Sequence, residues 1–110
     1  MNIKYKEYKE TVDMPIQDLQ KMVGPGWSGI IERLVNDLFA MGWNGEVHQV
    51  KEKFGTLRFY IGPGSEAFYA RIRLAEDESS STCEECGEPG APTETGWIKT
   101  LCEKHTLVRI

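Results

Sequence analysis

The longest amphipathic pattern in the chain covers residues 27–41. Its apolar residues recur every three or four positions, and polar or charged residues occupy the opposite side. This period predicts a helix with one buried face, and Gly42 would end that helix in a left-handed conformation. The apolar stripe, which we expect in the core, consists of Trp27, Ile30, Ile31, Leu34, Val35, Leu38 and Phe39.

The segment of residues 47–61 alternates between apolar and polar side chains and therefore predicts a β-hairpin. In its second strand, Leu57 and Phe59 would face the core, whereas Arg58 would point to the other face. The turn is expected near residues 52–56, where Gly55 can adopt a positive φ.

Weaker signals complete the predicted body of the protein. Asp13-Met14-Pro15 is typical of a helix start, with Pro15 in the first turn. A helix is expected over residues 66–78, with Ser65 as its N-cap. Residues 1–12 lack a clear period and indicate either an edge strand or a loosely held arm.

Length, composition and charge restrict the class of protein. The 110 residues suffice for one domain, or for a small domain with a metal-stabilised appendage. The formal net charge of -4 disfavours nonspecific nucleic-acid binding unless the basic groups are segregated. No apolar run is long enough for a bilayer, and the charged N-terminus does not fit a signal peptide. We therefore expect a soluble cytoplasmic protein without a membrane partner.

All three cysteines and one of the two histidines form a single pattern in the C-terminal part. Cys83 and Cys86 are separated by two residues, as are Cys102 and His105. Two such pairs joined by a ribbon-length loop predict a tetrahedral Cys3His site for one zinc ion. Four protein ligands leave no open coordination position, so the zinc would be structural and not catalytic. An iron–sulfur cluster is the weaker alternative.

These patterns together predict an α+β fold with two parts. Residues 1–80 would form a helix–β-hairpin–helix body, and residues 81–110 a module resembling a zinc ribbon or zinc knuckle, with both parts in one compact unit. The acidic, serine-rich residues 76–81 would be a frayed helix end or a short linker between them.

The predicted hairpin carries cationic and aromatic residues around its turn. Lys51, Lys53 and Arg58 alternate with Phe54 and Tyr60, which suits a phosphate, a nucleotide or an acidic protein surface. The alternative is a solvated strand face whose lysines keep the edge soluble.

Other charged residues and His48 bear on the choice between a binding surface, an enzyme and a nucleic-acid-binding module. Arg71 and Arg73 on the following helix would extend the cationic patch. His48 is a candidate base, but the sequence indicates no nucleophile for it. The metal module is rich in glutamate, which disfavours it as a reader of nucleic acid.

Four segments follow one another in a specific order: residues 24–27 (GPGW), 50–60 (VKEKFGTLRFY), 83–87 (CEECG) and 96–105 (GWIKTLCEKH). With them the chain resembles a family of small, largely uncharacterised proteins encoded by bacteria, prophages and tailed phages. The resemblance implies a phage-borne protein that acts by binding in the host cytoplasm. It places the contact surface on Lys51, Lys53, Phe54, Gly55, Arg58 and Tyr60, with Trp27 and Trp97 as possible aromatic walls.

The leading hypothesis is a noncatalytic, zinc-stabilised binding protein. Its partner would be a host protein or a nucleotide-like small molecule, so that it acts as an anti-defence inhibitor or as a sponge for a nucleotide signal. One alternative is a nucleic-acid-associated zinc module. The other is a small enzyme acting on a nucleotide or phosphate substrate, built around His48 and nearby carboxylates.

Overall fold

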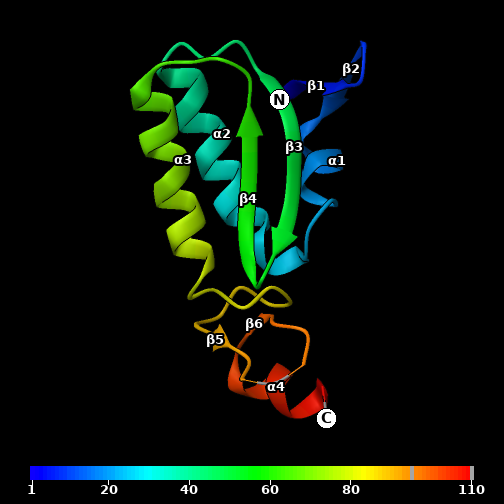
Figure 1. Ribbon diagram of the computed structural model, residues 1–110, viewed down its shortest axis with the longest axis vertical. Coiled ribbons are helices and arrows are strands. Elements are labelled where there is room, and N and C mark those ends of the chain that lie inside the picture. Colours follow the sequence, from blue (N-terminus) through cyan, green and yellow to red (C-terminus); the bar gives the residue numbers. More distant parts are fainter. Residues whose placement is uncertain (95, 110) are drawn as a thin grey trace.

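The computed structural model describes residues 1–94 and 96–109 and shows an elongated α+β molecule with dimensions of 41 × 26 × 21 Å. A four-stranded sheet with its helices forms the larger part. A smaller module with the predicted metal ligands lies at one end of the long axis (Figure 1). The predicted fold class, α+β with a C-terminal Cys3His module, is thereby confirmed. Within the described ranges, no helix has the length and apolar character needed to cross a bilayer.

The sheet has the strand order β2-β1-β3-β4. β1 and β3 are parallel, and the other neighbours are antiparallel. Residues 2–12 therefore belong to the sheet and are not a loosely held arm: β1 is an interior strand, and β2 is one of the two edge strands. The strands are β1 (Asn2–Glu7), β2 (Glu10–Pro15), β3 (Glu46–Lys53) and β4 (Thr56–Ile61).

The helices agree closely with the sequence-based boundaries. Gly42 has a φ of 96° just beyond α2, and the Ser65 hydroxyl caps α3 by accepting a hydrogen bond from the Phe68 N–H at 3.3 Å. Pro15 differs from the prediction, because it ends β2 in an extended conformation and only precedes α1. The helical elements are α1 (Ile16–Gln20), the 3₁₀ turn η1 (Pro25–Trp27), α2 (Ser28–Ala40) and α3 (Glu66–Ser79).

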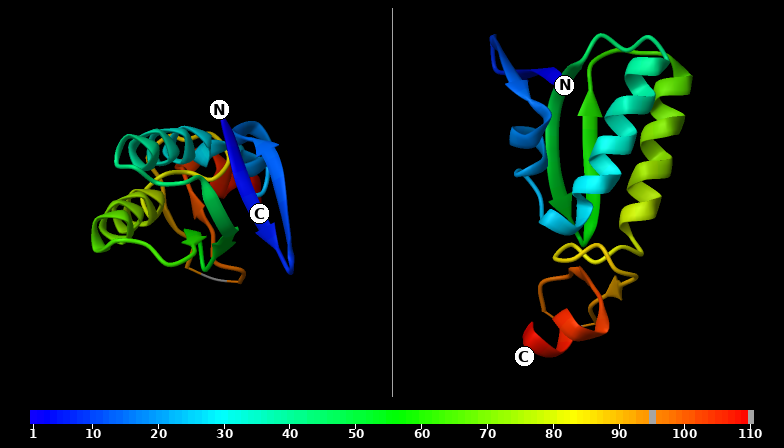
Figure 2. Two further views of the ribbon diagram at one scale, coloured as in Figure 1. Left: turned by 90° about the horizontal axis from the view of Figure 1, so that it is seen from above. Right: turned by 180° about the vertical axis from the view of Figure 1, so that it is seen from behind.

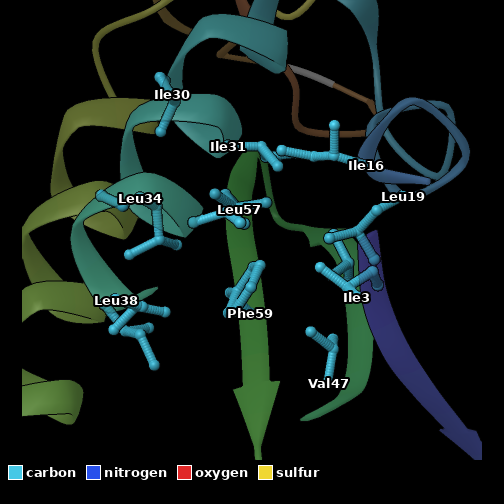
Figure 3. Close-up of a cluster of buried hydrophobic side chains, with 14 of the residues drawn as sticks. Ile3, Ile16, Leu19, Ile30, Ile31, Leu34, Leu38, Val47, Leu57 and Phe59 are labelled. Carbon is cyan, nitrogen blue, oxygen red and sulfur yellow. The ribbon is translucent and has the colours of Figure 1, made fainter. Parts of the chain in front are cut away.

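The core lies between α2 and one face of the sheet (Figure 3). The predicted alternation in β4 is present: Leu57 and Phe59 are buried, whereas Arg58 is half-buried and Tyr60 is exposed. Trp27 is fully buried in the same core. α2 and α3 lie on the same side of β3 and β4, so the opposite face of this hairpin has no helix on it (Figure 2).

The outer edge of β4 is covered by polar side chains of α3. Ser79 is fully buried, and its hydroxyl oxygen accepts a hydrogen bond of 2.8 Å from the Leu57 N–H. The Glu76 carboxylate accepts one of 3.0 Å from the Phe59 N–H. These bonds satisfy backbone groups that an edge strand would otherwise present to other chains. The prediction of a frayed end or linker over residues 76–81 is therefore wrong for Glu76 and Ser79, which belong to the last turn of α3.

The C-terminal module is built from short elements. The expected strand at residues 96–100 is reduced to β6 (Thr100–Leu101), which pairs antiparallel with β5 (Ala91–Pro92). α4 (Glu103–Arg109) begins one residue after β6.

Two segments of the body attach the module. The N–H of Gly26 donates to the Glu84 carbonyl at 2.7 Å, and the Trp27 indole N–H donates to the Thr82 carbonyl at 2.9 Å. At the hairpin turn, the Thr100 hydroxyl donates to the Gly55 carbonyl at 2.6 Å. A Cβ on Gly26 would lie 1.9 Å from the Cys83 carbonyl oxygen, so only glycine fits this contact. The segments that carry the family resemblance thus meet at one junction.

Candidate functional site

The four predicted metal ligands converge within the C-terminal module. Cys83 and Cys86 lie in the turn after α3, whereas Cys102 immediately precedes α4 and His105 lies in its first turn. Their ligand atoms all lie within 4.8 Å of one another. This Cys3His group is therefore positioned to hold a metal ion.

The separations between the ligand atoms fit tetrahedral coordination. A zinc–sulfur distance of about 2.3 Å implies sulfur atoms about 3.8 Å apart in a tetrahedron. The Sγ atoms of Cys86 and Cys102 are 3.7 Å apart. His105 Nδ1 lies 3.6 Å from the sulfur of Cys83 and 3.1 Å from that of Cys102. Thiolate and imidazole are the donors that zinc binds in closed sites.

The backbone around the first ligand pair favours a thiolate. Burial favours the neutral thiol of Cys83, but N–H groups of Cys102, Cys86 and Glu85 outweigh it and lower the pKa of Cys83 to about 6. The backbone of Glu88 favours ionisation of Cys86, but desolvation and the neighbouring thiols raise the pKa of Cys86. Cys83 is thus the first of this pair to become a metal-binding anion.

Glu84, between the first two ligands, is a structural residue that no sequence pattern indicates. Its side chain is only 3% exposed. One carboxylate oxygen accepts a hydrogen bond of 2.8 Å from the Thr100 N–H, and the other lies 3.1 Å from Lys99 Nζ. Glu84 therefore joins the first ligand turn to β6, the strand that leads to the second ligand pair.

The predicted binding residues of the hairpin occupy its helix-free face. Lys51 of β3 lies directly opposite Arg58 of β4, and Lys51 Nζ is 5.8 Å from the centre of the Tyr60 ring. At the turn, Lys53 Nζ is 5.6 Å from the ring of Phe54, which is 64% exposed. Both lysines are thus within cation–π distance of an aromatic ring.

The two tryptophans proposed as aromatic walls lie in different environments. Trp27 has no exposed surface and packs in the core, so its assignment to a surface site is wrong. Trp27 is instead a core residue, as predicted for the apolar stripe of the helix. Trp97 is 74% exposed in the loop of the metal module that leads to β6.

The predicted extension of the patch by Arg71 and Arg73 is wrong. Both lie on α3, where Arg71 pairs with Asp37 at 2.8 Å and Arg73 pairs with Glu66 at 2.9 Å. Their guanidinium groups belong to the helical layer and are already paired with carboxylates.

His48 lies in an irregular part of β3, where the register with β4 shifts. Its Nε2 atom is 3.7 Å from a carboxylate oxygen of Glu46. This distance suits an ion pair when the imidazole is protonated, and it exceeds the usual hydrogen-bond length.

Comparison with protein families yields no matching family model, and no curated protein or solved structure is significantly similar to the chain. The resemblance to bacterial and phage proteins therefore stays a prediction.

Proposed function

We propose that the chain is a noncatalytic binding protein in which one structural zinc ion stabilises the C-terminal module and the β3–β4 hairpin provides the contact surface. The observation that carries this proposal is the cross-strand pair of Lys51 and Arg58 beside the exposed ring of Tyr60. Within the described residues, neither cation lies within 4 Å of a carboxylate. Cationic groups held beside an aromatic face and free of carboxylates suit an anionic partner.

The choice of zinc rests on the donor set and its closed geometry. Three cysteines and one histidine at near-tetrahedral separations suit zinc better than magnesium or calcium, which prefer oxygen ligands. A four-ligand site leaves no coordination position for a substrate, so the ion would act by holding the module together.

The biological setting is proposed from the resemblance alone. A protein of phage origin would act in the host cytoplasm as an anti-defence inhibitor of a host protein, or as a sponge for a nucleotide-like signal. Both versions use the same contact surface, and both require binding without turnover.

One observation favours a second candidate, a small enzyme acting on a nucleotide or phosphate substrate. The carboxylate of Glu46 approaches His48 to 3.7 Å, and such a pair can orient an imidazole for proton transfer. Turnover of a nucleotide panel that disappears in His48→Ala would establish this candidate. We rank it second because the distance is long for the hydrogen bond that an oriented base needs.

Affinity capture from cell extract tests the leading proposal. The zinc-loaded wild type should retain a partner that Lys51→Ala/Arg58→Ala loses, whereas Arg33→Ala/Arg73→Ala should retain it. The control removes the same number of cations from the helical layer. Equal capture by all three proteins would contradict the assignment of the hairpin as the contact surface.

A further inference from the structure

The helix-free face of the sheet gathers cations, although the chain as a whole is acidic. Pairing of Lys4 with Glu46 and of Lys51 with Arg58 places these residues on the face opposite the core. On this face of the four strands, the cationic residues are Lys4, Lys6, Lys51, Lys53 and Arg58, and the acidic residues are Asp13 and Glu46. The face therefore has a local excess of three positive charges. We call the cations with their central ring the basic sheet face: Lys4, Lys6, Lys51, Lys53, Arg58 and Tyr60.

Most cations of this face have no carboxylate within 4 Å among the described residues, unlike the arginines of the helices. In the helical layer, the guanidinium groups of Arg33, Arg71 and Arg73 each lie within 3 Å of a carboxylate oxygen. On the basic sheet face, among the residues that the structure describes, only Lys6 has a carboxylate partner, Glu46 at 3.9 Å. The net charge of the chain is therefore a poor guide to the field that a ligand meets at this face.

The basic sheet face alternates charge and aromatic surface along the strands. Tyr60, 41% exposed, lies opposite Gln49, between the pair of Lys51 and Arg58 and the end of β3 near Lys6. The eight residues of β3 extend over roughly 25 Å at about 3.3 Å per residue. Phosphates along an extended chain could thus contact several cations while a base stacks on the ring.

The shape of this face selects among anionic partners. The pronounced hollows formed by described residues lie elsewhere, the most prominent being a groove of about 850 Å³ beside β5 and α4, and none is lined by Lys51, Arg58 or Tyr60. A single nucleotide would lack the enclosure that small-molecule sites provide. Protein interfaces are depleted in lysine, whereas four lysines occur here. A duplex offers no free base face to Tyr60.

We propose that the basic sheet face binds single-stranded nucleic acid, with Lys51, Arg58 and the β1 lysines on phosphates and a base stacked on Tyr60. This inference rests on the proposed function and names the partner class of the same surface. The net charge of the chain and the acidic metal module disfavour nucleic acid as a partner. The cations, however, gather on one face of the sheet, apart from the metal module.

Fluorescence anisotropy with labelled oligothymidylate and oligouridylate of about 15 nucleotides tests the inference. We expect the full-length, zinc-loaded protein to bind at low salt and to weaken steeply as salt is added. Lys51→Ala/Arg58→Ala should weaken binding at least tenfold and reduce the salt slope by about one to two. Tyr60→Ala should weaken it about tenfold and Tyr60→Phe little, because phenylalanine keeps the stacking face. The matched control Arg33→Ala/Arg73→Ala should bind like the wild type.

Three outcomes would overturn the inference: no binding of either oligonucleotide at low salt, equal loss in the matched control, or equally tight binding of poly-glutamate. Equally tight binding of poly-glutamate would show that the face binds polyanions in general and does not select nucleic acid. If affinity capture still finds a protein that depends on Lys51 and Arg58, the proposed function survives while the nucleic-acid inference fails. Either preference would support the inference: tighter binding of oligothymidylate would indicate single-stranded DNA as the ligand, and tighter binding of oligouridylate would indicate RNA.

Discussion

The hydroxyl group of Thr100 donates a hydrogen bond of 2.6 Å to the carbonyl oxygen of Gly55, in the turn of the β3–β4 hairpin. Thr100 is fully buried, and it precedes the predicted metal ligand Cys102 by two residues. The metal module is thereby joined directly to the proposed contact surface. Changes at the metal site should consequently reach the hairpin as well as the module.

Replacing Cys86 with serine removes one thiolate from the Cys3His group. Because metal binding and folding of such modules are coupled, the melting temperature should fall by at least about 5 °C, with residues 83–109 loosened most. Thermal melts in the presence of zinc measure this change. A chelator should lower the melting temperature of the wild type to that of the variant, and it should change the melting temperature of the variant little. Identical melts of wild type and variant with zinc present would contradict a stabilising metal.

Replacing Ser79 with alanine leaves the buried N–H of Leu57 without its acceptor. We expect a loss of about 1–3 kcal/mol in the free energy of unfolding, measured by chemical denaturation. Ser80→Ala is the matched control, because the Ser80 hydroxyl donates only to the nearby Asp77 carbonyl at an exposed position. Equal effects of the two substitutions would show that the bond between α3 and the β4 edge contributes nothing specific.

Two glycine-to-alanine substitutions should change the free energy of unfolding in opposite directions. A Cβ on Gly26 would overlap the Cys83 carbonyl, so Gly26→Ala should destabilise the junction by at least about 2 kcal/mol. A Cβ on Gly29 in α2 would meet only the flexible end of Arg33 at 3.2 Å. Gly29→Ala should therefore stabilise the helix by roughly 0.5–1 kcal/mol. A neutral Gly26→Ala would disprove the close contact between η1 and the first ligand turn.

The double substitution Lys51→Ala/Arg58→Ala should leave the fold nearly unchanged. The side chains lie on the helix-free face, and the cation–π contact of Lys51 contributes about 1 kcal/mol or less. We expect the free energy of unfolding to stay within about 1 kcal/mol of the wild type while partner binding is lost. A decrease of several kcal/mol in denaturation would instead assign these residues a structural role.

The features predicted from the sequence are those that local patterns determine. The alternation around Leu57 and Phe59 predicted the hairpin, and the spacing of Cys83, Cys86, Cys102 and His105 predicted that these four side chains converge, because both depend on short-range periods. Contacts between distant segments leave no such period. This explains why the sequence did not reveal the parallel pairing of β1 with β3.

The same limit applies to single polar residues. Glu84 resembles the other acidic residues of its module in the sequence, yet it is buried because the Thr100 N–H and the Lys99 ammonium group converge on it. In the sequence, Gly55 is a predicted turn residue and Gly26 belongs to a Gly-Pro-Gly segment. Their additional constraint, the close approach of the metal module, arises only when segments far apart in the chain meet.

Native mass spectrometry of protein purified from cell extract tests the central claim most directly. The wild type and Lys51→Ala/Arg58→Ala would be measured under mild and then denaturing conditions. We predict one zinc ion on both proteins, lost on denaturation, and an additional bound mass on the wild type alone. Absence of zinc from both proteins, or the same bound mass on the variant, would contradict a zinc-stabilised binding protein that uses this hairpin.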